Sequence, residues 1–164
     1  MKTYKIYLKF IELNLLIQLP ILISINLLVG EVLDIIFELI NKEDVLKLDF
    51  SSYTVFEIVL ETVFLAPIIE TIIFQFLFIE IFLYLFSKLT IKNKKGIIVF
   101  LSGILFGVLH LYNISYMIST AIFGWIYGSI YFFYKVNGKI NPFLAVLIIH
   151  AFDNLFTLLM DYTL

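Results

Sequence analysis

The sequence predicts an all-α, multi-pass integral membrane helix bundle of about five transmembrane helices plus one interfacial amphipathic helix. Of its 164 residues, 62% are hydrophobic and only 15% are charged, whereas soluble domains are about half apolar and a quarter charged. The apolar residues also form tracts of the length needed to cross a bilayer, about 20 residues of helix. Since the sequence shows no repeat, low-complexity segment or second domain, residues 1–164 are expected to form a single membrane domain.

The composition excludes several classes of function. The chain has no cysteine, so disulfides, thiolate metal sites and cysteine nucleophiles are excluded. All eleven basic residues are lysines, and the formal net charge is −2. No basic patch is therefore expected, and the sequence does not favour nucleic acid as a partner.

The first expected transmembrane helix is the uncharged run from Leu13 to Gly30. It is longer than the core of a secretory signal and lacks a small-x-small cleavage site, so an uncleaved helix is predicted, with a kink at Pro20. From Glu31 to Lys42 polar residues recur three or four apart, which is typical of an amphipathic helix on the membrane surface. A polar link follows at residues 43–52.

The rest of the chain contains three long apolar tracts. Tyr53–Phe86 exceeds one bilayer crossing at about 1.5 Å per residue, so this helix is expected to be tilted or broken at Ala66–Pro67. Gly96–Tyr134 contains no Asp, Glu, Lys or Arg and predicts two spans with a tight turn near Leu111–Asn113. Pro142 begins the last span, which is expected to end near Asp161.

The lysines predict one orientation in the membrane. Five spans place the N-terminus and the loops at residues 88–95 and 135–139 on one side, and these segments hold nine of the eleven lysines. The excess of lysine and arginine in cytoplasmic loops assigns that side to the cytoplasm. The acidic segment 31–49 then faces outward. We expect a multi-pass cell-membrane protein of bacterial type, surrounded by lipid bilayer, with a cytoplasmic N-terminus.

Four polar residues stand out within these apolar tracts: Glu70, His110, His150 and Asn154. An ionisable side chain inside a membrane is costly and is by default a functional-site candidate. Counted along the helices from the lysine-bearing ends, the four lie between about 12 and 24 Å deep, so they can converge. His150 and Asn154 are four residues apart and share one helix face, as do Phe106 and His110.

Hydrolysis is the chemistry that such a set can support. Apolar surroundings destabilise the charged form of a carboxylate, which makes it a better base towards water. One histidine can share that work, while a second histidine and an asparagine amide can donate hydrogen bonds to an oxyanion. Ser115 and Ser119 are interpreted as turn and helix-packing residues. Asp153 could orient His150, be solvated or pair helices.

Three segments resemble the ordered motifs of one family. Ala66-Pro-Ile-Ile-Glu70-Thr-Ile-Ile-Phe-Gln75, Phe106-Gly-Val-Leu-His110 and His150-Ala-Phe-Asp-Asn154 are similar to Glu-Glu-x-x-x-Arg, Phe-x-x-x-His and His-x-x-x-Asn. These are the motifs of the CAAX protease and bacteriocin-processing family, also called the Abi or Rce1-like intramembrane endopeptidases. The resemblance covers about residues 61–160, the expected catalytic core.

The resemblance implies an intramembrane endopeptidase that cleaves a peptide or a membrane-associated protein without a cofactor. Glu70 would activate the attacking water and His110 would assist it, while His150 and Asn154 would bind the oxyanion. Phe106, Thr71 and Gln75 would support these residues. Thr71 stands where the family usually has its second Glu, and Gln75 where it has Arg. Because both charges are replaced together, a Thr71–Gln75 hydrogen bond could substitute for the ion pair and leave catalysis possible.

Three other functions are compatible with these residues. A catalytically silent relative could act in bacteriocin self-immunity or as a membrane scaffold. A small proton-coupled transporter could use Glu70 and the histidines as a relay. A zinc hydrolase could bind its metal through the histidines and Glu70; against zinc, Asn154 is a poor metal ligand but a good oxyanion donor.

Overall fold

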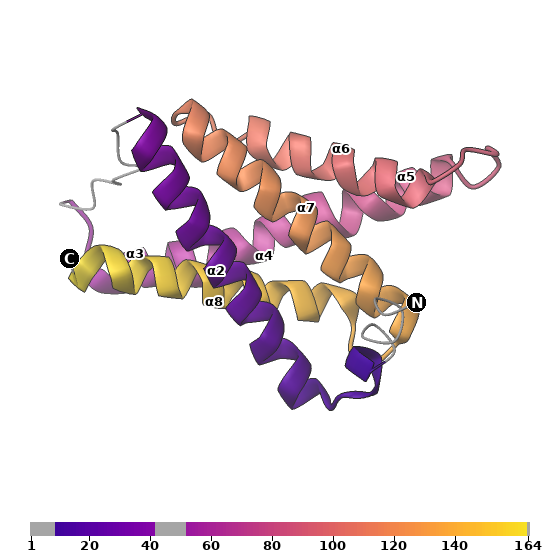
Figure 1. Ribbon diagram of the computed structural model, residues 1–164, viewed down its shortest axis with the longest axis horizontal. Helices are drawn as coiled ribbons and strands as arrows, with labels where there is room; N and C mark the ends of the chain where they lie inside the picture. Colours follow the sequence, from indigo (N-terminus) through magenta and orange to yellow (C-terminus); the bar gives the residue numbers. More distant parts are fainter. Residues whose placement is uncertain (1–8, 42–51, 164) are drawn as a thin grey trace.

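Every regular element in the part of the chain that the computed structural model describes, residues 9–41 and 52–163, is a helix (Figure 1). This confirms the all-α prediction. Four helices within these ranges are long and apolar enough to cross a membrane, and α6, at 15 residues, covers about 22 Å. The helices are α2 (Leu15–Asn41), a long helix (Val55–Leu85), α6 (Lys94–Val108), α7 (Ile114–Asn137) and α8 (Pro142–Thr163).

Local sequence signals set the helix ends. Thr54 and Glu57 form a reciprocal capping box at the start of the long helix. The Asn113 side chain accepts the Tyr116 N–H at 2.7 Å and so begins α7 directly after the predicted turn. Gly138 ends α7 with φ of 65°, a left-handed conformation that favours glycine. The boundaries of the last three helices therefore follow those predicted from the sequence.

The predicted interfacial helix is not a separate element. α2 passes through Gly30 without interruption and reaches Asn41. Gly30 lies beside Phe123 of α7: a Cβ atom added there would be 3.4 Å from the Phe123 Cζ atom, which is ordinary van der Waals contact. Lys42 and most of the expected polar link, residues 43–51, lie outside the described residues.

The predicted break at Ala66–Pro67 is absent, and the long helix is continuous over 31 residues. Proline lacks an N–H and normally disrupts a helix at this point. Here a π-helical segment precedes it, and the Ala66 N–H donates to the Glu61 carbonyl five residues back. The long helix consists of α3 (Val55–Val59), η1 (Leu60–Leu65), α4 (Ala66–Glu70), η2 (Thr71–Phe78) and α5 (Ile79–Leu85).

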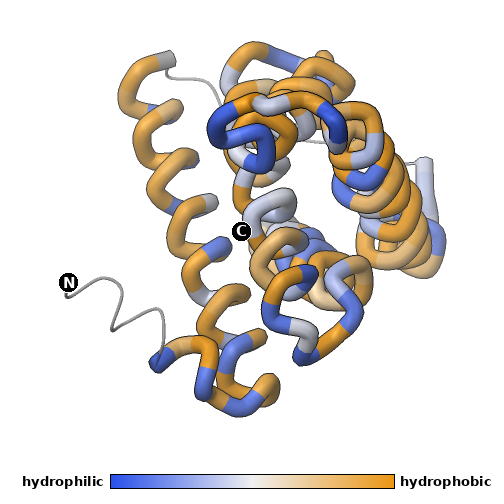
Figure 2. The backbone as a smooth tube through the Cα atoms, turned by 90° about the vertical axis from the view of Figure 1, so that its right-hand side faces the viewer, coloured by the Kyte–Doolittle hydropathy of each residue, from blue (hydrophilic) through white to orange (hydrophobic). Residues whose placement is uncertain are grey.

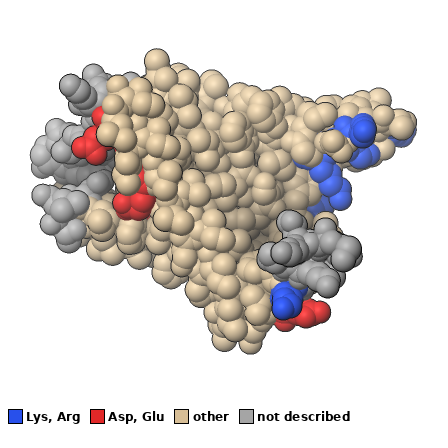
Figure 3. Space-filling model, viewed as in Figure 1, with Lys and Arg blue, Asp and Glu red and all other residues tan. Residues whose placement is uncertain are grey.

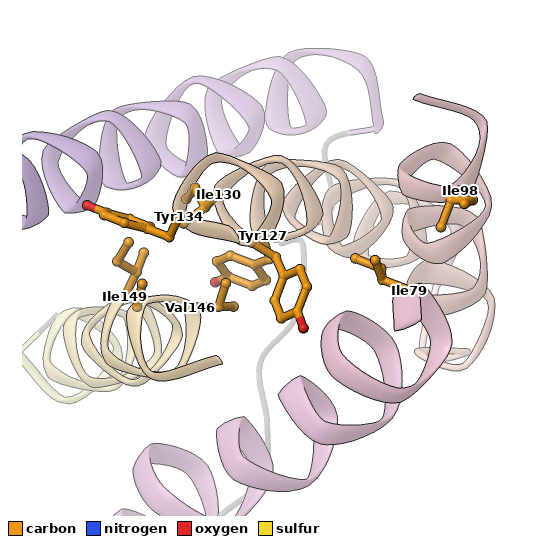
Figure 4. Packing of buried hydrophobic residues seen from close by; sticks show 9 residues of the cluster. Ile79, Ile98, Tyr127, Ile130, Tyr134, Val146 and Ile149 are labelled. Carbon is orange, nitrogen blue, oxygen red and sulfur yellow. The ribbon is translucent and has the colours of Figure 1, made fainter. Parts of the chain in front are cut away.

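The core lies between α5, α6, α7 and α8. Figure 4 shows its side chains pointing into the space between these helices. Figure 2 shows the helices coloured mainly as hydrophobic, with many of the hydrophilic residues in the turns. Labelled members of the core are Ile79, Ile98, Tyr127, Ile130, Tyr134, Val146 and Ile149.

Glycines allow α6 and α7 to pack at close range. Each helix carries a Gly-x-x-x-Gly pattern, Gly103 with Gly107 on α6 and Gly124 with Gly128 on α7. A Cβ atom at Gly124 would lie 2.9 Å from both the Gly103 Cα and the Phe106 Cβ, which is closer than carbon atoms normally approach. Small residues at this spacing are typical of membrane helix pairs. This packing positions the end of α6, which carries Phe106 towards the candidate site.

The lysine-bearing turns lie at one end of the molecule. Two antiparallel connections place the α5–α6 turn at the same end as the α7–α8 turn. The Lys139 ammonium donates to the Leu13 carbonyl, which brings the start of α2 to this end as well. In Figure 3 the visible lysines gather here, and most of the visible acidic residues lie at the opposite end.

Candidate active site

Glu70 lies between the two histidines predicted to share its site. Its Oε1 is 3.7 Å from Nε2 of His110, and its Oε2 is 3.5 Å from Nε2 of His150. The three residues come from α4, the turn after α6, and α8. The Glu70 side chain is 23% exposed and that of His150 only 4%. Each carboxylate oxygen thus faces one imidazole, and one side of the carboxylate remains accessible.

His110 is held in one tautomer by its own helix. Its Nδ1 lies 2.6 Å from the Phe106 carbonyl oxygen. Because a carbonyl oxygen only accepts hydrogen bonds, Nδ1 must carry the proton and donate. A neutral His110 therefore presents an unprotonated Nε2 to Glu70. Two hydrogen-bond acceptors then face each other across 3.7 Å.

Aromatic rings fix the orientation of His150. The Tyr127 ring stacks on the imidazole at a centroid distance of 4.6 Å, and the Phe106 ring meets it edge-on at 6.0 Å. Phe106 also lies 4.6 Å from the His110 ring. Phe106, expected to support the site, is therefore packed against both histidines.

Asn154 lies one turn beyond His150, and its amide nitrogen donates to the Thr62 carbonyl at 2.8 Å. This carbonyl is available because the Ala66 N–H bonds instead to Glu61, and Pro67 has no N–H to offer. The hydrogen bond ties α8 to the helix that carries Glu70. An asparagine amide has two N–H groups, so a second donor remains.

A family described as type II CAAX prenyl endopeptidase, Rce1-like, matches residues 52–156, which is more than half of the chain. The chain belongs to the Rce1-like family. No curated protein and no solved structure matches it. The matched range contains Glu70, both histidines and Asn154. Membership of a membrane endopeptidase family, together with the apolar helices, makes this chain a multi-pass membrane protein and confirms the resemblance seen in the sequence.

In this Rce1-like chain the expected Thr71–Gln75 hydrogen bond is absent. Both side chains are fully buried, and Thr71 Oγ1 and both polar atoms of the Gln75 amide have no hydrogen-bond partner among the described residues. They belong to the π-helical segment η2, whose i→i+5 register changes the alignment that side chains four apart have in an α-helix. Thr71 and Gln75, which stand where the family has Glu and Arg, are therefore uncharged, but their polar side-chain atoms make no hydrogen bond with the described residues.

Tyr127 and Asn26, two residues that the sequence did not single out, connect Asp153 to the Rce1-like site. Tyr127, which stacks on His150, donates its hydroxyl to Asp153 Oδ2 at 2.7 Å. Asn26 on α2 donates to the same oxygen at 2.9 Å. Asp153 therefore supports His150 through Tyr127. Asn26 and Asp153 are each a polar residue within an apolar tract, which could have marked them as candidates. Nothing in the sequence near either residue indicates that they pair with each other.

The zinc alternative requires three ligands that converge on one point. Among the residues at 9–41 and 52–163, no three His, Asp or Glu side chains are arranged to hold a metal ion. Zinc binds imidazole nitrogen at about 2.0–2.1 Å and carboxylate oxygen at about 2.0–2.2 Å. The two histidines of this Rce1-like chain face different oxygens of Glu70. The presence or absence of zinc stays a prediction.

Proposed function

We propose that this protein is an intramembrane endopeptidase in which Glu70 activates a water molecule for attack on a peptide bond. The observation that carries the proposal is the 3.7 Å approach of Glu70 Oε1 to His110 Nε2. A neutral His110 needs a donor there, and a water can lie about 2.8 Å from both atoms and give one hydrogen to each. The attacking oxygen then has its lone pairs free for the substrate carbonyl.

Glu70 would act first as a base and then as an acid. As the water oxygen bonds to the peptide carbon, one of its protons moves to the Glu70 carboxylate and a tetrahedral oxyanion forms. Glu70 then returns the proton to the leaving nitrogen as the C–N bond breaks. His110 would hold the second hydrogen of the water and keep its oxygen aimed at the carbonyl.

His150 and Asn154 are our proposed oxyanion donors. They share one face of α8, four residues apart, and Asn154 keeps one N–H beyond its bond to Thr62. Removing a single donor of this kind typically costs about 10²–10³ in kcat. The buried position of His150 favours this role, because hydrogen bonds to a developing charge are stronger where water is excluded.

The substrate would be a peptide or a membrane-associated protein. The family description, CAAX prenyl endopeptidase, favours a prenylated substrate. The second candidate function is that of a catalytically silent relative, acting in bacteriocin self-immunity or as a scaffold. It is favoured by the neutral Thr71 and Gln75, which stand where the family motif has charged residues.

A cleavage assay separates the two candidates. The purified full chain in lipid nanodiscs would be incubated with prenylated and unprenylated peptides, and the products read by mass spectrometry. We expect the wild type to cleave and Glu70→Gln to lose activity by about 10²–10⁴-fold, since an amide cannot accept the proton of the water. Glu61→Gln, an exposed change on the same long helix, should behave as wild type. A folded wild type without activity would favour the silent relative.

A further inference from the structure

Asn26 connects α2 to the candidate active site. It is fully buried, although most of α2 presents large apolar side chains to its surroundings, among them Leu16 and Leu28. The Asn26 amide nitrogen donates to Asp153 Oδ2 at 2.9 Å, and Figure 1 shows α2 crossing α8. α2 lies outside residues 52–156, the range that matches the Rce1-like family. The contact is therefore made by a part of the chain that the family match does not include.

The connection continues from Asp153 to the ring of His150. The Tyr127 hydroxyl donates to the same oxygen, Asp153 Oδ2, at 2.7 Å. The Tyr127 ring stacks on the His150 imidazole, with a centroid distance of 4.6 Å and an interplanar angle of 30°. All three residues are buried, so bulk water does not compete for these contacts. One carboxylate oxygen thus links α2 to the ring of a proposed oxyanion donor.

The orientation of His150 depends on its aromatic neighbours. Its Nδ1 is buried and has no hydrogen-bond partner among the described residues. Its Nε2 is 3.5 Å from Glu70 Oε2, which is too far for a strong hydrogen bond. Hydrogen bonds of the imidazole itself therefore do not fix its plane. An oxyanion donor must point at the developing charge, and a misplacement of about 1 Å can cost about 10² in rate.

We propose that α2 is a functional part of the active site, in which Asn26 is a positioning residue for His150. Asn26 and Tyr127 hold Asp153 Oδ2 from two different helices, and Asp153 in turn holds the hydroxyl of the ring that stacks on His150. This role rests on the proposed endopeptidase function, in which His150 is an oxyanion donor. Asn26 acts only through other residues, so its loss changes the aim of the donor and leaves substrate binding intact.

The test is a double-mutant cycle on peptide cleavage by the full chain in nanodiscs. Asn26→Leu should lower kcat by about 10- to 100-fold and leave KM unchanged. Tyr127→Phe keeps the ring, removes the hydroxyl and should lower kcat to a similar extent. Because both variants break the same link, Asn26→Leu should cause no further loss of kcat in the Tyr127→Phe background. Losses that multiply would show that Asn26 acts independently of Tyr127 and would overturn the proposal.

Gln18→Leu is the matched control. Gln18 is also a fully buried polar residue of α2, but it lies about two turns before Asn26, and its amide donates to the Phe10 carbonyl at 2.7 Å. Gln18→Leu should leave kcat unchanged even where the melting temperature falls. An equal loss of kcat in Gln18→Leu and Asn26→Leu would show a general effect of helix packing and would overturn the positioning role.

A second readout does not depend on activity. The chain has two histidines, so protein made with nitrogen-15 histidine gives imidazole NMR signals from two residues, which His110→Gln assigns. The His150 signals should shift in Asn26→Leu and Tyr127→Phe and stay in place in Gln18→Leu.

The two readouts separate the positioning role from the proposed function. Shifted His150 signals with no cleavage by the wild type would contradict the endopeptidase function but support the link from α2 to His150. Unshifted His150 signals in an enzyme that cleaves its substrate would overturn the link alone. If Asn26→Leu does not fold, Tyr127→Phe decides, because it removes only the hydroxyl that bonds to Asp153.

Discussion

Each residue of the candidate site is held by a neighbour that fixes its orientation. The Phe106 carbonyl sets the tautomer of His110, the Tyr127 ring sets the plane of His150, and the Thr62 carbonyl holds Asn154. The sequence could predict Glu70, the histidines and Asn154, because ionisable and amide groups in apolar tracts are conspicuous. It could not predict the Thr62 contact, since that carbonyl becomes available only through the π-helical register before Pro67.

Asn154→Ala should reduce stability as well as activity. Removing the amide leaves the Thr62 carbonyl without its donor, and because this hydrogen bond is partly buried the cost should be about 1 kcal/mol, at the low end of the range of about 1–3 kcal/mol for buried groups. Thermal melting in detergent would measure the loss. Asn137→Ala is the matched control, because among the described residues the Asn137 side chain donates to the Phe133 carbonyl of its own helix and to no other helix. An equal melting temperature for Asn154→Ala and wild type would show that the contact between helices contributes nothing.

Apolar replacements at Thr71 and Gln75 should be tolerated or stabilising. Thr71→Val and Gln75→Met keep the approximate side-chain size and remove polar atoms that have no partner. We expect melting temperatures equal to or above that of the wild type. A loss of more than about 1 kcal/mol in either variant would reveal a hydrogen bond that the buried groups do make.

At the scale of the helices, backbone geometry explains where the sequence prediction was wrong. Proline at position 67 predicted a break, because proline removes an α-helical hydrogen bond. The π-helical segment before it supplies a wider register, so the helix continues and carries Glu70 into the bundle. The helix propensities of the residues do not indicate a π-helical segment, because such segments are rare. They frequently occur at functional sites. The turn near Leu111–Asn113 was predictable because the uncharged tract 96–134 is too long for one span, and in the structure the Asn113 side chain caps the start of α7.

The close packing of α6 and α7 gives a prediction about their glycines. Gly124→Ala would place a Cβ atom 2.9 Å from the Phe106 Cβ and from the opposing backbone, so the helices must separate. Overpacking of this kind costs about 1–3 kcal/mol. Gly96→Ala, with nothing within 4 Å of its added Cβ, should be neutral or slightly stabilising. Thermal melting that ranks the two variants equally would contradict the packing argument.

At the scale of the whole molecule, the distribution of charge agrees with a single orientation. The lysine-bearing turns lie at one end, and most of the acidic residues visible in Figure 3 lie at the other, in agreement with the predicted orientation. This arrangement was predictable because charge and helix length are visible in sequence. The way α2 crosses α8 was not (Figure 1), because no local pattern in the sequence pairs Asn26 with Asp153, whose buried hydrogen bond joins the two helices.

The orientation itself is a prediction. The chain has no cysteine, so single cysteines report position without background. Lys92→Cys, in the α5–α6 turn, should be protected from an impermeant thiol reagent in intact cells, because lysine-rich loops remain in the cytoplasm. Tyr112→Cys, exposed at the other end of α6, should be labelled. The opposite pattern of labelling would reverse the topology.

The most direct test of the central claim is the experimental density around Glu70 in a structure of the wild type in a membrane mimetic. The account predicts one water within about 3 Å of both Glu70 Oε1 and His110 Nε2, with Asn154 still bonded to Thr62. Anomalous data collected at the zinc edge should be featureless at that position. An anomalous peak ligated by Glu70 and the histidines, or a Glu70 side chain turned away from both, would contradict it.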